Sequence, residues 1–247
     1  MRSLINIKKA CSNTDKKVVN GQNNVGLGGV GRSKKHESAD KHVAGEAIYV
    51  DDRPALRGEL HAAVGQSSHA HATILSMDLS AVKKAEGVVA VITVDNVPGH
   101  TDIGPVFPGD PVLAIGKVEY VGQPIFAVAA TSYDLARKAV QLAKVEYQAL
   151  EAVLTVKDAL AKQSFASAQH QLSGAIVVGG QEHMYLEGQV STAVPTEDGG
   201  MNIYTSSQHP SEVQKLVAEV LAIPLNKVLV DMRRMGGGFG GKETQAA

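Results

Sequence analysis

The 247-residue sequence has a single cysteine, Cys11, and this shortage excludes several kinds of site. One thiol cannot close an internal disulfide, and it cannot build a zinc or iron–sulfur centre from cysteine ligands. Such cysteine usage is typical of a reducing compartment. Net charge is also small, at −1, so no strong field attracts nucleic acid or an anionic membrane surface.

The sequence lacks a long hydrophobic run as well. Nothing in it approaches the roughly 18 consecutive apolar residues of a transmembrane helix, and the apolar stretch near the N-terminus is too short for a signal peptide. We therefore expect a cytoplasmic protein that neither crosses a membrane nor binds nucleic acid. Hydrophobic residues make up 44% of the chain and charged residues 20%, which is typical of a soluble globular protein.

The composition and the periodicity of the sequence change near residue 36. Residues 1–36 are polar, rich in Gly, Asn and Lys, and without periodicity, so they predict a flexible leader. Strands are then expected at 58–64, 88–93, within 116–131 and at 144–150. A short helix is expected after Asp78, and an amphipathic helix over 132–143, with Ser132 as its N-cap and with Leu135, Ala139 and Leu142 on one face. This alternation predicts a compact α/β or α+β domain.

The second half begins with residues 161–173, which read as a linker by composition. Strands are expected at 175–180, 188–196, 200–207 and 226–235, with a turn at 198–200. Residues 209–224 predict the clearest helix, because Pro210 suits its first turn and Pro224 lies beyond its end. Its apolar stripe consists of Val213, Leu216, Val217, Val220 and Leu221.

The last expected strand runs into GGGFGGKE, residues 236–243, which we call the glycine loop. Gly236 to Lys242 fits the triphosphate-binding pattern G-x-x-x-x-G-K, but Glu243 stands where Ser or Thr should hold magnesium. The spacing also fits G-x-G-x-x-G, but a dinucleotide site is recognised by an acidic residue roughly 20 positions further on, and the 247 residues do not reach that position, so this test cannot be made. A flexible tail would not explain Phe239. A close approach of the backbone to a ligand accounts better for the glycines.

Other groups invite metal-site interpretations. His69 and His71 project to one side of an extended segment but have no third ligand nearby. Glu182, His183 and Glu187 lack the H-E-x-x-H order of zinc proteases. We interpret these side chains as surface or hydrogen-bonded residues.

Two stretches together carry a family resemblance. GGQEHMYLEGQ, residues 179–189, is here called the glutamine segment, and RMGGGFGGKET occupies residues 234–244. In this order and at this spacing they resemble the molybdenum-cofactor domain of the xanthine dehydrogenase and aldehyde oxidase family, in particular the molybdopterin-binding subunit of its bacterial members. Upstream, residues 36–54 and 58–78 resemble the start of that family's α/β hammerhead domain. The resemblance implies an α+β fold, with a hammerhead-like domain at 37–160, the linker at 161–173 and the beginning of a molybdopterin-binding domain at 174–247.

The resemblance also implies roles for four residues. Gln181 would lie beside molybdenum and its oxo group, where an amide can donate a hydrogen bond without adding charge. Phe239 and Gly240 would approach the metal ligands through close contact and backbone. Glu243 would face and help hold a purine substrate. The implied cofactor is molybdenum–molybdopterin.

The implied reaction is hydroxylation of hypoxanthine or xanthine to urate, with water as the oxygen source. Electrons would leave through 2Fe–2S clusters and FAD, expected on a partner subunit of a hetero-oligomer, to NAD. The family's general base and a substrate-binding arginine come later than the matched motifs, so no catalytic residue is assigned here. We expect a truncated fragment that is inactive in isolation. The alternative is an α/β ligand-binding module that presents a glycine-rich phosphate loop without catalysis.

Overall fold

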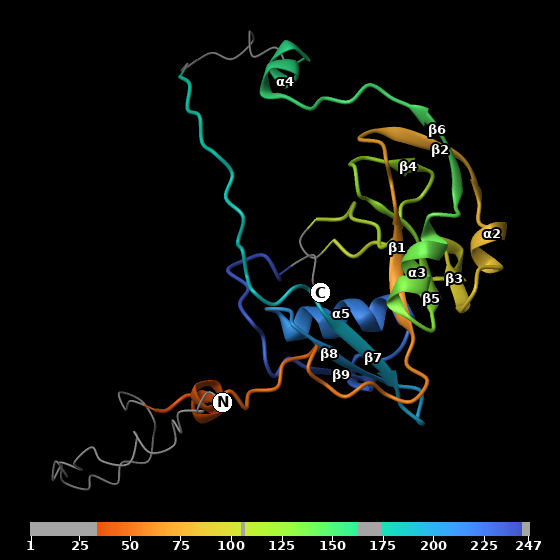
Figure 1. The fold of residues 1–247 in the computed structure, drawn as a ribbon. Helices are drawn as coiled ribbons and strands as arrows, with labels where there is room; N and C mark the ends of the chain where they lie inside the picture. The colour runs from red at the N-terminus through yellow and green to blue at the C-terminus, as the bar shows by residue number, and fades with distance from the viewer. Residues whose placement is uncertain (1–33, 105–106, 163–173, 244–247) are drawn as a thin grey trace, which may run out of the picture. The chain divides into compact units, whose positions relative to one another are not determined.

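The computed structural model describes residues 34–104, 107–162 and 174–243 (Figure 1), so most of the expected leader and linker lie outside it. The chain divides into two compact units, Met1–Glu46 and Ala47–Ala247. In the first unit, helix α1 (Ala39–Ala44) ends at Gly45, which is left-handed with φ 70°. The sequence did not predict α1, because none of its residues is buried and it carries no apolar stripe.

The second unit opens with two antiparallel three-stranded sheets (Figure 1). One has the order β1-β5-β3, and the other has the order β4-β2-β6. The strands are β1 (His61–Gln66), β2 (Ala72–Asp78), β3 (Val88–Ile92), β4 (Lys117–Val118), β5 (Pro124–Ala130) and β6 (Lys144–Ala149). Helices α2 (Ser80–Lys83) and α3 (Tyr133–Val140) and the 3-10 turn η2 (Val94–Asn96) connect them.

Helix α3 begins where the sequence predicts. The Ser132 hydroxyl accepts a hydrogen bond from the Leu135 amide at 3.3 Å, which satisfies one of the free N–H groups of the first turn. Ala136 and Ala139 are buried against β1 and β5. The expected face is wrong at one end: α3 stops at Val140, and Leu142 is 46% exposed beyond it.

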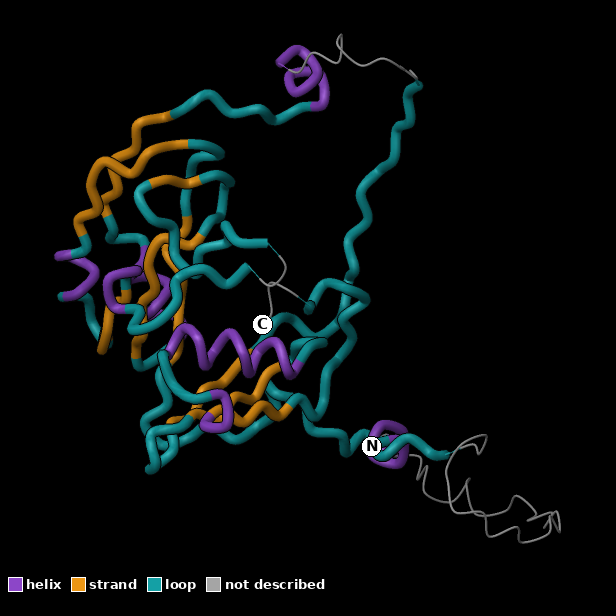
Figure 2. Tube along the Cα trace, turned by 180° about the vertical axis from the view of Figure 1, so that it is seen from behind, coloured by secondary structure: helices purple, strands orange, loops and turns teal. Residues whose placement is uncertain are grey.

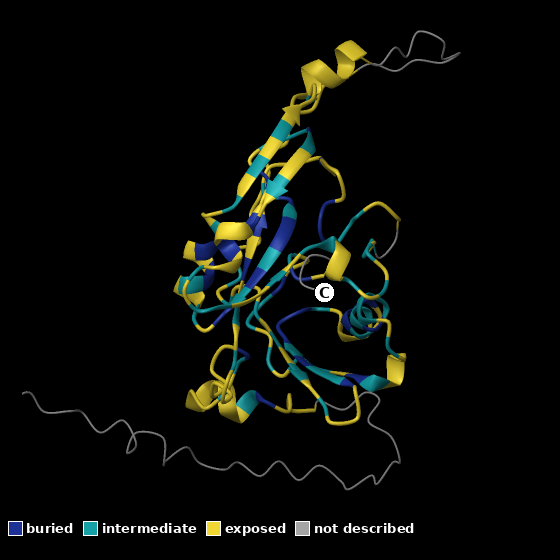
Figure 3. Cartoon of the chain, turned by 90° about the vertical axis from the view of Figure 1, so that its right-hand side faces the viewer, coloured by how far each residue is buried: buried dark blue, intermediate teal, exposed yellow. Residues whose placement is uncertain are grey.

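The core between the two sheets is apolar. It gathers Val82 of α2, Val118 of β4 and Phe126 of β5, among other residues, and Figure 3 shows the buried residues concentrated in the strands. Phe126 is 1% exposed and lies against Gly65 of β1. A Cβ atom on Gly65 would sit 2.0 Å from a ring carbon of Phe126, so a side chain at Gly65 is sterically excluded.

A third sheet has the order β7-β8-β9, with β7 (Ser191–Pro195), β8 (Met201–Thr205) and β9 (Val228–Asp231). β7 and β8 form an antiparallel hairpin whose turn contains Gly199 at φ 76°, as the sequence predicts. β8 and β9 are parallel. A parallel pair requires a crossover, and helix α5 (Pro210–Leu221) with the 3-10 turn η3 (Leu225–Lys227) supplies it, packing on β9 (Figure 2).

Helix α5 confirms the predicted place of Pro210 in its first turn, and Val213 and Leu216 of its predicted apolar stripe are buried. Its two caps were not predicted: the His209 ring accepts from the Glu212 amide at 3.1 Å, and Ala222 ends the helix in a left-handed conformation. Val213 and Ala218 form a core with Ile203 and Val228. Within the described residues, no helix combines the length and the apolar character needed to cross a membrane.

Several expected elements were wrong or missing. Residues 175–180 do not form the expected strand; Ile176 and Val177 are 87% and 98% exposed. The strand expected over 226–235 covers only Val228–Asp231. The sequence did not predict β2, whose burial does not alternate, or helix α4 (Val156–Lys162), which buries no residue. In each case the local apolar pattern did not match the element that forms.

Candidate functional site

The glutamine segment and the glycine loop lie against each other. The Glu187 carboxylate accepts from the Gly236 amide at 2.6 Å, and the Glu187 amide donates to the Gly236 carbonyl at 3.4 Å. The Gln189 side-chain amide donates to the Gly241 carbonyl at 3.1 Å. The fold therefore brings together two stretches that are some 50 residues apart in sequence.

A buried ion pair joins the same two stretches. Lys242 Nζ lies 3.0 Å from Glu187 Oε2, and the two side chains are 0% and 11% exposed. The ammonium also lies 4.8 Å from the centre of the Tyr185 ring. Glu187 Oε1 is buried and accepts no hydrogen bond within the described part of the chain. Lys242 thus points into the protein rather than towards a ligand outside the loop.

The stretch TSSQ, residues 205–208, connects β8 to α5 and binds both segments; we call it the TSSQ connection. Gln208 Oε1 accepts from the Gly240 amide at 2.9 Å and from the Lys242 amide at 3.1 Å. The backbone amide of Gln208 and the hydroxyl of Ser207 both donate to the Lys242 carbonyl, at 2.7 and 3.1 Å. Lys242 is therefore held by its backbone as well as by its side chain.

Ser206 holds the other segment. Its hydroxyl accepts from the Val190 amide at 3.1 Å and donates to the Gly188 carbonyl at 3.2 Å. Ser206 and Ser207 are both 0% exposed, so these bonds are sheltered from water. Buried hydroxyls need such partners, because an unpaired one would lose its hydration without compensation.

The glycine loop needs its glycines for steric reasons. A Cβ on Gly238 would lie 2.5 Å from the Gln208 side chain, and one on Gly241 would lie 2.6 Å from the Tyr185 ring. Gly237 and Gly240 have φ values of 95° and 93°, which suit glycine. Phe239 has φ 53° and is 76% exposed, so a strained aromatic residue stands at the surface of the loop.

The four residues expected to form the site lie in these two segments. Phe239, Gly240 and Glu243 are exposed on the glycine loop, and Gln181 is exposed on the glutamine segment, two residues before His183. A Cβ on Gly240 would lie 3.7 Å from His183 Nε2, so these two residues are neighbours. The structure leaves Gln181 exposed rather than packed on the loop. The roles of the four residues stay predictions.

The TSSQ connection is the part of this region that sequence reasoning missed. A run of short polar residues follows a buried strand and precedes a helix N-terminus. Because the carboxyl end of a strand in a β-α-β crossover is where open sheets place their binding sites, that run was a usable signal. The strand expected at 200–207 covers most of this run, whereas β8 ends at Thr205.

The metal-site and nucleotide interpretations lose support. The His69 ring packs on Tyr147 at 4.5 Å between ring centres, and His71 Nδ1 lies 2.8 Å from the Glu151 carbonyl. In residues 34–104, 107–162 and 174–243, no group of three His, Cys, Asp or Glu is placed to hold a metal ion. A triphosphate loop needs a free lysine and free amides, whereas Lys242 is paired and two loop amides are bound to Gln208.

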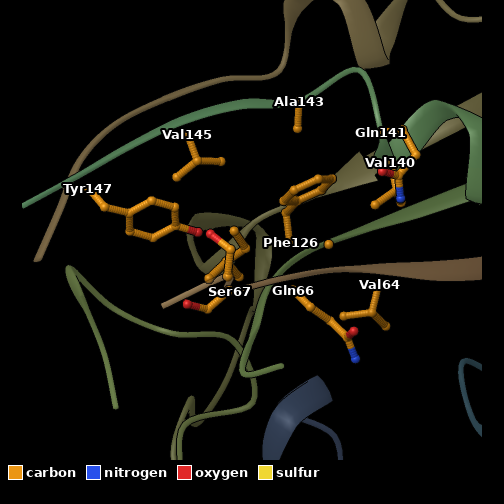
Figure 4. Close-up of a pocket in the computed structure, with 12 residues that line it drawn as sticks. Val64, Gln66, Ser67, Phe126, Val140, Gln141, Ala143, Val145 and Tyr147 are labelled. Carbon is orange, nitrogen blue, oxygen red and sulfur yellow. The ribbon is translucent and has the colours of Figure 1, made fainter. Parts of the chain in front are cut away.

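A separate cavity of about 430 Å³ lies between the first two sheets, beside Phe126 (Figure 4). Its wall includes Ser67, Gln141 and Tyr147, and no charged residue lines it. Burial raises the pKa of the Tyr147 hydroxyl, so it is neutral at physiological pH. With no group able to titrate near pH 7 and no residue of the glycine loop, this cavity is the weaker candidate for chemistry.

Comparison with known families matches both parts of the chain. Residues 44–151 match the aldehyde oxidase and xanthine dehydrogenase a/b hammerhead domain. Residues 146–247 match the molybdopterin cofactor-binding domain, which includes the glutamine segment, the TSSQ connection and the glycine loop.

Individual proteins agree with these matches. The chain is 40% identical over 240 residues to xanthine dehydrogenase of Blastobotrys adeninivorans, covering 87% of this chain and 17% of that protein. It is 38% identical over 234 residues to xanthine dehydrogenase/oxidase of Mus musculus, covering 88% and 18%. Its fold is similar to aldehyde oxidoreductase of Desulfovibrio gigas, with a TM-score of 0.71, 29% identity, and coverage of 83% and 27%. The chain thus spans about a sixth of the length of these curated relatives.

Proposed function

We propose, from the premise that this chain belongs to the xanthine dehydrogenase and aldehyde oxidase family of molybdenum hydroxylases, that it provides part of the cofactor site of such an enzyme. The observation that carries the proposal is the junction of the glutamine segment with the glycine loop. The buried pair of Glu187 and Lys242 holds the glutamine segment and the glycine loop together. Phe239, Gly240 and Glu243 are exposed on the surface of the loop.

The residues present fit molybdenum–molybdopterin. The outer side of the glycine loop offers an exposed aromatic ring and exposed main chain, while the inner side is filled by Gln208 and Tyr185. Because no described His, Cys or carboxylate cluster could bind a metal, these residues would hold the cofactor by shape and hydrogen bonds. When bound, the cofactor supplies the redox and oxygen-transfer chemistry.

The chain's own residues would then bind and orient. The Gln181 amide would donate a hydrogen bond without adding charge, and the Phe239 ring would cover one side of the cofactor. The Glu243 carboxylate would accept from a ring N–H of a purine and so fix its orientation. The structure refines one expectation: because Gln208 already accepts from the Gly240 amide, Gly240 would contribute its Cα surface and carbonyl rather than its N–H.

The complete enzyme in this proposal oxidises hypoxanthine or xanthine to urate, in the cytoplasm. Iron–sulfur clusters and FAD on a partner subunit carry the electrons to NAD. No group in the described residues is assigned as the general base, so we expect the 247-residue chain alone to turn over no purine. A phosphate-binding module without catalysis is disfavoured by the buried position of Lys242.

The test is to express the chain in a host that makes the molybdenum cofactor and to purify it with any subunits it retains. Molybdenum and pterin per chain are then measured by metal analysis and by pterin fluorescence after oxidation. We expect both to co-purify with the unmodified protein. Replacing Phe239 by Ala should lower cofactor retention about ten-fold, as is usual when a supporting contact is lost.

Phe107 provides a matched control, because it is 81% exposed and lies outside the glycine loop. Phe107→Ala should retain the cofactor fully. Absence of pterin from every preparation, or equal retention by both variants, would contradict the proposal. Xanthine-dependent NAD reduction by the assembled complex, but not by the chain alone, would support the reaction assigned.

A further inference from the structure

The conformation of Phe239 needs an explanation. Outside glycine, left-handed residues in the described chain are Met184, Phe239 and Ala222. Ala222 simply ends helix α5, but Met184 and Phe239 lie in the two motif segments and are 80% and 76% exposed. A bulky residue in this region of φ is strained, and exposed rings gain little from packing. Something else must hold Phe239 in place.

Gln208 is positioned to do so. Its side-chain oxygen accepts from the backbone amides of Gly240 and Lys242, at 2.9 and 3.1 Å. These two bonds fix the backbone directly after Phe239. On the other side, the Gly236 amide donates to Glu187 at 2.6 Å. The Lys242 ammonium pairs with the same carboxylate, so residues near both ends of the glycine loop are bound to Glu187.

We propose that Gln208 is a positioning residue: its side-chain oxygen holds the glycine loop so that Phe239 stays left-handed, with its ring presented outward to the cofactor. This inference rests on the proposed function for what the ring meets, but the holding itself is a property of the chain without cofactor. Gln208 touches neither the cofactor nor a substrate in this proposal. It acts through Phe239 and Gly240.

The first measurement is hydrogen exchange of backbone amides in the full 247-residue chain, followed by NMR. In the unmodified chain, the amides of Gly240 and Lys242 should exchange more slowly than those of Gly179 and Gly180. The latter are exposed glycines in the glutamine segment with no atom within 4 Å of a Cβ position. Equal exchange at the two pairs would overturn the proposal, whatever the variants do.

The second measurement reports how mobile the aromatic side chain at position 239 is. The chain contains no tryptophan but six tyrosines, so Phe239→Trp introduces a single tryptophan at the loop, which is excited at wavelengths where tyrosine does not absorb. In that background Gln208→Met keeps the length of the side chain but removes the acceptor, and Gln208→Glu keeps the acceptor. We expect Gln208→Met to lower the fluorescence anisotropy and to speed exchange at Gly240 and Lys242 roughly ten-fold, the effect of losing two hydrogen bonds. Gln208→Glu should restore both readouts.

Gln214→Met is the matched control. Gln214 also makes two hydrogen bonds, to the carbonyls of Leu225 and Val228 at 3.3 and 2.8 Å, but it lies on α5 away from the glycine loop. This variant should leave the fluorophore and the two loop amides unchanged. An effect on them equal to that of Gln208→Met would show a general loss of structure and would overturn the assignment.

The outcome is separable from that of the proposed function. Protected loop amides and a restrained fluorophore, in a protein that never binds pterin, would retain the positioning role and refute the cofactor site. Free exchange at Gly240 and Lys242 in a protein that does bind pterin would refute only the role of Gln208.

Discussion

The two sheets of residues 61–149 and the junction around the glycine loop differ in what fills their interiors. Between the sheets the buried residues are Val82, Val118, Phe126 and similar apolar side chains. At the junction they are Ser206, Ser207 and Lys242, which are all 0% exposed. Apolar contacts are non-directional, whereas hydrogen bonds and ion pairs demand one geometry. The first region is therefore held by close packing, and the second specifies where a loop must lie.

The largest expected effect tests the apolar side of this comparison. Phe126→Ala should lower the free energy of unfolding by about 3–5 kcal/mol, because it removes a buried ring and leaves a cavity. Urea unfolding followed by circular dichroism measures it. Phe107→Ala, at an 81% exposed phenylalanine, should change the stability by less than about 0.5 kcal/mol. Similar losses in both variants would show that the core does not depend on Phe126.

The next effect tests the polar side. Lys242→Met should destabilise by about 3 kcal/mol, because it leaves the Glu187 carboxylate buried without its counter-charge. Adding Glu187→Gln should recover most of the loss, since an amide oxygen can still accept from the Gly236 amide. Urea unfolding of the single and double variants gives the coupling between the two residues.

A second lysine controls for charge alone. Lys215 and Glu219 form an exposed pair at 3.9 Å on α5, and Lys215→Met should change the stability by less than about 0.5 kcal/mol. If Lys242→Met is as mild as Lys215→Met, the junction is not held by its ion pair.

A smaller effect is expected at Phe239 itself. Because Phe239 is left-handed and exposed, Phe239→Gly relieves strain that Phe239→Ala retains. The glycine variant should be the more stable of the two by about 1 kcal/mol, measured as a difference in unfolding midpoint at equal slope. The reverse order would mean that the residue is not left-handed in solution.

The smallest effect lies in the hairpin turn between β7 and β8. Hydrogen bonds from Lys227, at 2.7 Å, and from Thr196 lower the pKa of Asp198 to about 2. Because the pKa is lowered in the folded state, the stabilisation is present above about pH 4 and is lost as the pH falls towards 2. Lys227→Met should raise the pKa of Asp198 towards its ordinary value, measured by carbon NMR of the carboxyl group. An unchanged titration would show that Lys227 does not form this bond in solution.

Local signals in the sequence predicted those elements whose cause is local. Helix α5 followed from its proline and its apolar spacing, the start of α3 from Ser132, and the β7–β8 turn from its glycines. The same reasoning failed for residues 175–180, where an apolar run suggested a strand. A strand needs a partner to satisfy its backbone, and these residues form no strand in the structure.

The candidate site also has features that local sequence signals predict and features that depend on the tertiary structure. The sequence by itself determined the family, through two motifs in order, and with it the residues expected to face the cofactor. Only the tertiary structure decided that Lys242 turns inward to Glu187, 55 positions away, and that Gln208, 34 positions from Lys242, holds two loop amides. No periodicity encodes such partners, because each bond depends on how the fold brings distant segments of the chain together. The glycines indicate that other atoms approach the loop backbone closely. The fold shows that, at Gly238 and Gly241, these atoms belong to the side chains of Gln208 and Tyr185.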